Sequence, residues 1–195
     1  MASGSFLAAS ALAESNDLHA QHRTIIESSS NGKSKVVVTQ HQYTLPEVTL
    51  TNSLGQQVRV DELFSNHKPF ALNFIFTTCT TICPVMTSTM LQFQRQLDDI
   101  DHTVPNIVSI SIDPNYDQAS TLKSYADMYG ADWTFLTGDE EDVLEVLKAL
   151  DAYRGNKVNH FPLTLLRPSS SPQWTRVEGM VSAKKLADTW IGIQG

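Results

Sequence analysis

Apolar residues follow two different spacings along this chain, and the alternation between them predicts an α/β domain. Short apolar runs bounded by Pro, Gly or Asp are typical of β-strands, whereas apolar residues that recur every three or four positions are typical of amphipathic helices. The runs predict strands at 43–50, 57–60, 69–76, 107–112, 133–136, 163–166 and 174–178. The helical spacing predicts a short turn at 61–64 and helices at 84–97, 117–129, 139–150 and 182–190.

The order of these elements predicts the architecture of the sheet. A hairpin comes first, a β-α-β-α-β-α segment follows, and the chain ends in β-β-α. Alternating strands and helices are typical of α/β folds, in which helices cover the sheet. We therefore expect a central mixed sheet with helices on both faces and an N-terminal β-hairpin.

The strongest candidate for chemistry lies where the strand at 69–76 passes into a helix. Cys79 and Cys83, the only cysteines among 195 residues, occupy this transition, and Pro84 suits a first helical turn. Unpaired backbone N–H groups and the helix dipole favour the thiolate there. A spacing of four places both sulfur atoms on one side, so the pair can form a disulfide or bind a soft metal ion. The alternative is a structural pair, either two buried thiols or a disulfide that only stabilises the fold.

The position of the dithiol also favours a particular fold. Two cysteines after the first core strand, together with a β-β-α ending, suggest the thioredoxin fold. In such a sheet the loop before the penultimate strand, which carries His160, lies beside the dithiol. A single loop histidine is more often a surface residue, so His160 is a candidate only because of the cysteines. Met86 and Met90 recur at helical spacing and are assigned to the core rather than to a metal site.

Composition limits the classes of partner. The 14 Lys and Arg residues against 21 Asp and Glu residues give a formal charge of -7. This charge argues against nucleic acid or an anionic membrane surface as the main partner. No apolar run reaches the roughly 20 residues that a membrane-spanning helix needs. With 41% hydrophobic residues, the chain can form one good core and is expected to contain a single domain with a tail.

The tail is expected to be a flexible leader and linker at residues 1–35, ahead of one domain at 36–195. Residues 6–13 resemble the end of a signal sequence or membrane anchor, but they lack a basic start and a full apolar core. Residues 28–34 are rich in Ser and typical of a linker. His19 and His22 lie in this polar segment and are interpreted as solvated rather than metal-binding.

Three segments together resemble the Sco/SenC family. They are Asn73–Pro84 with both cysteines, Ser109–Pro114 followed by Asp117, and Val158–His160. A Cys-x-x-x-Cys motif alone is a weak signal, but its combination with a Phe-x-x-Thr-x-Cys lead, an Asp-Pro loop and a distal histidine is fairly specific. The resemblance covers about residues 43–190. It departs at residues 167–172, where the family usually has an Asp-Pro-x-Gly turn.

The resemblance implies a thioredoxin-fold copper chaperone rather than a turnover enzyme. Members of the family are usually membrane-anchored, face the periplasm or intermembrane space, and serve the CuA centre of cytochrome c oxidase. In the family the two cysteines and the distal histidine bind copper, which carries over to Cys79, Cys83 and His160. Two thiolates and an imidazole suit Cu(I) and can also hold Cu(II). The expected partner is the copper-binding subunit of the oxidase or another copper or thiol protein. Asp113 and Asp117 are not assigned to the metal site and are expected to shape and cap a loop.

A second hypothesis is a thiol-disulfide oxidoreductase that reduces cysteines of a partner protein. Cys79 would be the attacking thiol because it precedes the helix and is less enclosed. Pro162 is similar in position to the cis-proline that faces the dithiol in thioredoxins, which favours redox chemistry. The Cys-x-x-x-Cys spacing argues against it, because the familiar redox motif is Cys-x-x-Cys. A peroxidase is a third, weaker interpretation.

Overall fold

The secondary structure follows the expected order, with two additional strands before the predicted hairpin. The computed structural model describes residues 24–25, 35–65 and 68–194. Its strands are β1 (Thr24–Ile25), β2 (Val37–His41), β3 (Thr49–Asn52), β4 (Gln57–Arg59), β5 (Phe70–Ile75), β6 (Asn106–Ser111), β7 (Thr134–Thr137), β8 (Leu163–Arg167) and β9 (Trp174–Glu178). Its helices are α1 (Val60–Ser65), α2 (Ile82–Asp99), α3 (Ala119–Tyr129), α4 (Glu140–Ala149), α5 (Ala183–Gly192) and the 3-10 turn η1 (Lys157–Asn159).

The described strands form one mixed sheet in the order β1-β2-β9-β8-β5-β6-β7-β3-β4. The neighbours β5, β6 and β7 pair in parallel, because helices α2 and α3 return the chain to the same end of the sheet. Strands β8, β9 and β2 extend the β5 side in antiparallel fashion. This arrangement confirms the predicted α/β class and the central mixed sheet.

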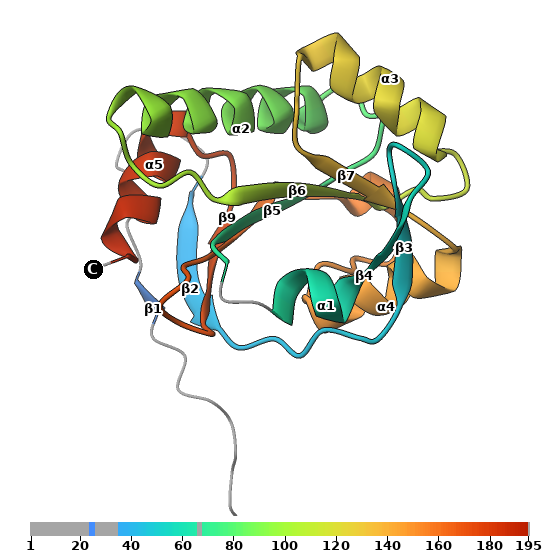
Figure 1. Cartoon of the computed structure of the whole chain (residues 1–195), viewed down its shortest axis with the longest axis horizontal. Coiled ribbons are helices and arrows are strands. Elements are labelled where there is room, and N and C mark those ends of the chain that lie inside the picture. Colours follow the sequence, from blue (N-terminus) through green and yellow to red (C-terminus); the bar gives the residue numbers. More distant parts are fainter. Residues whose placement is uncertain (1–23, 26–34, 66–67, 195) are drawn as a thin grey trace, which may run out of the picture.

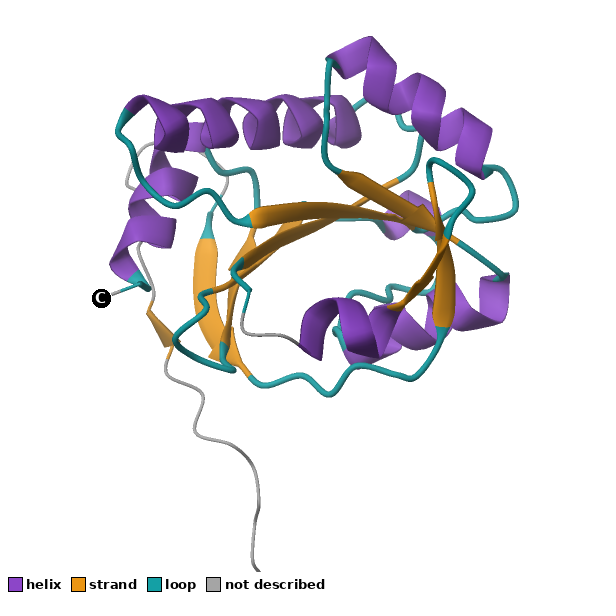
Figure 2. Ribbon diagram, viewed as in Figure 1, coloured by secondary structure: helices purple, strands orange, loops and turns teal. Residues whose placement is uncertain are grey.

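Helices cover both faces of the sheet, as expected from the alternating pattern. Helices α2, α3 and α5 lie on one face, and α1 and α4 lie on the other (Figures 1 and 2). Strand β5 separates two cores, since all six of its residues are buried. Phe74 packs into the core on the α1 and α4 face, whereas Ile75 packs with the two cysteines on the opposite face. Burial of both faces explains why residues 70–75 are apolar at every position except Asn73.

The predicted strand at 43–50 is wrong over most of its length. Only β3, which starts at Thr49, belongs to the sheet, and residues 42–48 form no strand. Pro46 lacks a backbone N–H and restricts Leu45, so this segment cannot supply a regular ladder of hydrogen bonds. The preceding β2 pairs instead with β9 along its whole length, from Val37 opposite Glu178 to His41 opposite Trp174.

The predicted leader at 1–35 lies mostly outside the described residues, including the signal-like segment 6–13, the linker 28–34, His19 and His22. Within it the structure describes Thr24 and Ile25, whose backbone pairs antiparallel with β2. Among the residues that the structure describes, no helix combines the length and apolar character needed to cross a bilayer.

Candidate metal and thiol site

The two cysteines lie at the carboxyl end of β5, where the chain turns into α2. Cys79 belongs to the connecting turn, and its backbone N–H donates to the carbonyl oxygen of Phe76 at 3.1 Å. Cys83 lies in the first turn of α2, so its own N–H is free of intrahelical bonding and donates to Sγ of Cys79 at 3.4 Å. Both are free thiols. The predicted strand-to-helix position of the pair is therefore confirmed.

The two thiols differ in exposure and in acidity. Cys79 is 8% exposed, whereas Cys83 is completely buried. Burial raises the pKa of Cys79, but hydrogen bonds from Cys83 and Thr81 outweigh that effect and hold the pKa below its usual value. Burial raises the pKa of Cys83 well above its usual range, and the contact with Cys79 raises it further. Cys79 is thus the thiol that more readily becomes a nucleophile or a first metal ligand.

His160 is brought to this dithiol by the turn η1, which precedes β8. The Asn156 side chain accepts a hydrogen bond from the N–H of Val158 and so starts the turn. Nδ1 of His160 lies 3.7 Å from Sγ of Cys83, and its ring packs edge-on against Phe76 with centroids 5.8 Å apart. The sequence-based prediction that His160 lies beside the cysteines is therefore confirmed, although His160 follows Cys83 by 77 residues.

His160 borders a small cavity and carries a buried ring nitrogen. Its Nε2 atom is buried and has no hydrogen-bond partner within the described part of the chain. Burial lowers the pKa of His160, and the nearby backbone of Phe74 opposes this shift. A cavity of about 60 Å³ borders His160 and is lined by Tyr153, Arg154 and Lys157, among others. The imidazole is therefore favoured in its neutral form, which is the form that binds a metal.

The three candidate ligands do not yet surround a common point. Across residues 24–25, 35–65 and 68–194, no three His, Cys, Asp or Glu side chains form a group ready to hold a metal ion. Cys83 is the shared neighbour, because it contacts Cys79 through its backbone and His160 through its sulfur. The arrangement in this structure is therefore two pairwise contacts that share Cys83, not a closed set of three ligands. The donor types nevertheless fit a soft ion such as copper.

Asp117 supports the turn before Cys79, a role that differs in part from the prediction. Asp117 is the first residue of the helix predicted at 117–129 and a suitable cap for it, but the cap residue of α3 is Gln118, which has no capping side-chain bond. The fully buried Asp117 carboxylate instead accepts hydrogen bonds from the N–H and hydroxyl of Thr77 and, at 2.6 Å, from the hydroxyl of Ser111. It does shape the loop as expected, by fixing the end of β6 to the residues that lead into the dithiol.

A second polar contact joins the histidine turn to the loop after β6. Lys157 of η1 forms an ion pair with Asp113, the acidic residue of the Asp-Pro motif. The Lys157 ammonium also lies 5.8 Å from the centroid of the Phe76 ring, which itself contacts His160. The sequence gives no sign of this pair, because only the fold brings together two residues that are 44 positions apart.

The remaining candidates lie near the site without forming part of it. Met86 and Met90 are buried on the inner face of α2, which agrees with their assignment to the core. Pro162 follows His160 by two residues, but the bond before it is trans, as are the other described peptide bonds. The comparison of Pro162 with the cis-proline of thioredoxins therefore does not extend to the isomer.

Fold and site together define a thioredoxin-like protein with a dithiol at a strand-to-helix turn and a histidine beside it. A family model described as SCO1/SenC matches residues 37–164, more than half of this chain. The chain therefore belongs to the Sco/SenC family.

Individual relatives agree with this assignment. The SCO1 protein homolog of Bacillus subtilis is 35% identical over 108 residues, covering 53% of each chain. A protein of Stutzerimonas stutzeri that is named for copper binding is 29% identical over 118 residues, or 60% of this chain and 57% of the relative. The chain spans about half the length of these curated relatives.

Solved structures show the same fold. BsSco, described as a member of the Sco family of cytochrome c oxidase assembly proteins with a disulfide switch, aligns with a TM-score of 0.63 and 27% identity. The alignment covers 77% of this chain and 93% of BsSco. Copper-bound yeast Sco1 gives a TM-score of 0.65 at 19% identity, covering 77% of this chain and 87% of that one, and at this identity it supports the fold alone.

Proposed function

We propose that this protein is a copper metallochaperone that holds a single copper ion through Cys79, Cys83 and His160. The observation that carries the proposal is the contact between the imidazole of His160 and the buried thiol of Cys83, beside a second thiol with a lowered pKa. Two sulfur donors and one nitrogen donor are the ligands that Cu(I) prefers, and they also stabilise Cu(II). Carboxylate-seeking ions such as Mg²⁺ would gain little at this site.

The recipient in this proposal is the CuA site of cytochrome c oxidase, which the protein loads or prepares. Membership of the Sco/SenC family supports this choice, as does the likeness to BsSco, a protein of cytochrome c oxidase assembly. The relative named for copper binding supports copper as the cargo. Residues 36–195 form the copper-binding domain in this proposal, which acts outside the cytoplasm, where such a recipient receives its copper.

Copper binding is expected to order the loop that carries His160. The three donors do not form a closed ligand set in the described structure, and a cavity of about 60 Å³ borders His160, so the loop can rearrange when a metal binds. NMR signals from residues 157–161 should therefore be broad or weak in the copper-free protein and sharpen when Cu(I) is added. Signals that stay unchanged at saturation would remove His160 from the ligand set.

Anaerobic titration of the reduced protein with Cu(I) tests the proposal. We expect one copper per chain, with weaker binding in Cys79→Ala, Cys83→Ala and His160→Ala. His102→Ala provides the matched control, because this half-buried histidine follows the far end of α2 and lies away from the dithiol. Failure to bind Cu(I), or full binding by Cys79→Ala, would contradict the proposal.

Thiol-disulfide exchange is the second candidate, and the asymmetry of the two thiols favours it. The more exposed thiol, Cys79, has a lowered pKa and can attack a disulfide of a partner, and the fully buried thiol of Cys83 can then resolve the mixed disulfide. The attack forms one S–S bond to Cys79 and releases a partner thiolate. Reaction of Cys83 with Cys79 then releases the second thiolate, so the dithiol is oxidised as the partner is reduced. Rapid reduction of insulin by the copper-free protein would favour this function.

A further inference from the structure

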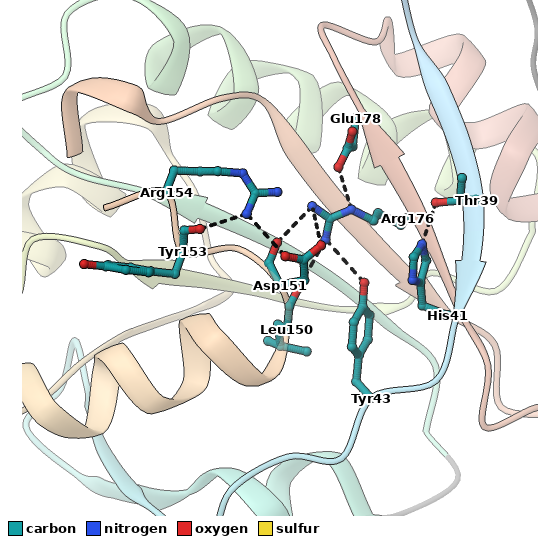
Figure 3. A network of polar contacts seen from close by, with 9 residues as sticks. All are labelled: Thr39, His41, Tyr43, Leu150, Asp151, Tyr153, Arg154, Arg176 and Glu178. Carbon is teal, nitrogen blue, oxygen red and sulfur yellow. Dashed lines mark hydrogen bonds and ion pairs between the residues drawn. The ribbon is translucent and has the colours of Figure 1, made fainter. Parts of the chain in front are cut away.

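A buried arginine lies behind the segment that carries His160. Arg176 belongs to β9, and its side chain is 2% exposed. Its Nε donates to Glu178 at 2.7 Å, and the other two nitrogens donate to the hydroxyl of Tyr43 and to the carbonyl oxygens of Leu150 and Asp151, at 3.0 to 3.3 Å (Figure 3). A buried charge is costly unless it is paired and hydrogen-bonded, and this one meets both conditions.

The network joins three parts of the chain that are distant in sequence. Tyr43 follows β2, Leu150 and Asp151 directly follow α4, and Arg176 lies on β9. The carbonyl oxygens of Leu150 and Asp151 accept hydrogen bonds from the guanidinium, where the helix has ended and supplies no further N–H donors. An apolar side chain could fill the same space but could not donate these hydrogen bonds. The guanidinium therefore fixes the end of α4 relative to β9.

The same arginine contacts the residue that follows His160. The Phe161 ring has its centroid 5.8 Å from the Arg176 guanidinium and 4.4 Å from that of Arg154, both within the range of a cation–π interaction. Asp151 connects the two arginines, because its carboxylate lies 3.4 Å from Nη1 of Arg154 and 3.8 Å from Nη2 of Arg176. The ring is thus held by two cations that share one carboxylate.

The backbone after Phe161 is held by the same strand. The N–H of Gly179 donates to the carbonyl oxygen of Pro162 at 2.9 Å, and Leu163 pairs with Glu178 in the sheet. Strand β9 and Gly179, which follows it, therefore hold the backbone of residues 162–163, in addition to the contact of Arg176 with the Phe161 ring. Any shift of these residues moves His160, since it directly precedes them.

We infer that Arg176 is a positioning residue for His160, acting through the Phe161 ring to set the distance between the imidazole and Cys83. This inference rests on the proposed function, in which the imidazole binds copper. Among the described residues, Arg176 itself contacts neither of the two cysteine sulfur atoms nor His160. Its role is that of an outer partner that orients a ligand, and loss of such partners typically weakens metal binding about 10- to 100-fold.

The test compares Arg176→Met with Arg167→Met in the whole 195-residue chain. Arg167 lies on the adjacent strand β8, donates to the carbonyl oxygen of Phe64 at 2.6 Å and packs on Trp174, so its replacement makes the same chemical change away from His160. We expect Arg176→Met to weaken Cu(I) binding about tenfold and Arg167→Met to leave it unchanged. Arg176→Lys should restore part of the loss, because lysine keeps the charge but not the planar set of donors.

A double-mutant cycle separates positioning from general destabilisation. If Arg176 acts through the histidine, Arg176→Met should weaken copper binding in the wild-type background and have no further effect in His160→Ala. Equal weakening in both backgrounds, or wild-type affinity in folded Arg176→Met, would overturn the inference. Phe161→Leu removes the ring but keeps an apolar side chain, so it gives the same test if Arg176→Met does not fold.

The copper-free protein distinguishes this inference from the proposed function. Arg176→Met should shift the NMR signals of the His160 ring without copper, and Arg167→Met should not. If wild-type protein bound no copper, the proposed function would fail, while the altered ring signals would still support the positioning role. Unaltered ring signals in Arg176→Met would reject the positioning role, whatever the copper affinity.

Discussion

Replacement of Asp117 by alanine should destabilise the protein and loosen the turn that carries Cys79. The carboxylate is fully buried and accepts from the N–H of Thr77 at 3.0 Å, from the Thr77 hydroxyl and from the Ser111 hydroxyl. Asp117→Ala removes the acceptor for all three donors. It leaves the donors in place, in a site that water cannot easily reach.

The size of the effect follows from these contacts. A hydrogen bond to a charged group contributes about 1.5–3 kcal/mol, and three are lost. Two of the donors are hydroxyl groups that can rotate toward other acceptors, and removal of a buried charge recovers part of its desolvation cost. We therefore expect the free energy of unfolding to fall by about 2–4 kcal/mol, well below the simple sum.

Urea denaturation measures this change, with Asp127→Ala as the matched control. Asp127 lies on the exposed side of α3 and pairs with Lys123 at 2.5 Å, an interaction that contributes less than about 0.5 kcal/mol. Hydrogen exchange at the Thr77 amide should also become faster in Asp117→Ala but not in Asp127→Ala. A loss below about 1 kcal/mol with the Thr77 amide still protected would refute the role assigned to Asp117.

Two further predictions follow from local geometry. Gly179→Ala should lower stability by at least about 2 kcal/mol in urea denaturation, because φ is +102° and a Cβ would lie 2.7 Å from the Lys35 carbonyl oxygen. Gly130→Ala should cost only about 1 kcal/mol, since its φ is +64° but nothing lies within 4 Å of the added Cβ. In the reduced, copper-free protein, iodoacetamide should modify Cys79 well before Cys83, as followed by peptide mass spectrometry, because Cys79 is 8% exposed and Cys83 is not exposed.

Clear results would contradict these two predictions. Equal stability losses for the two glycine variants would show that the Lys35 carbonyl imposes no constraint at Gly179. Modification of Cys83 at the same rate as Cys79, while the protein remains folded, would show that the first turn of α2 opens more readily than the burial of Cys83 indicates.

The sequence predicted those parts of the fold that depend on local periodicity. The alternation of apolar runs and helical spacing predicted the mixed sheet, and the change of spacing after residue 76 placed the dithiol at the start of α2. Gly130 directly follows the helix predicted at 117–129 and ends α3 in the left-handed conformation, which is typical of a glycine at this position. These signals are carried by neighbouring residues, so they can be read without knowing the fold.

The features of the fold and site that the sequence did not predict depend on contacts between distant segments. Strand β2 is half-buried along its length, so it lacks the clear apolar run that predicted the central strands. Asp117 has the sequence appearance of a helix cap, and only the packing of β6 against the turn after β5 directs its carboxylate to Thr77. Arg176 lies between Thr175 and Val177 in β9, and only its contacts with Tyr43, Leu150 and Asp151 show that this charged side chain is buried.

X-ray absorption of the Cu(I)-loaded protein tests the central claim most directly, because it counts the donor atoms around the metal. We predict two sulfur neighbours and one nitrogen neighbour in the wild-type protein. His160→Ala should lose the nitrogen contribution and keep both sulfur atoms, and His102→Ala should match the wild type. A copper environment that His160→Ala leaves unaltered, or that retains two sulfur neighbours in Cys83→Ala, would contradict a site formed by Cys79, Cys83 and His160.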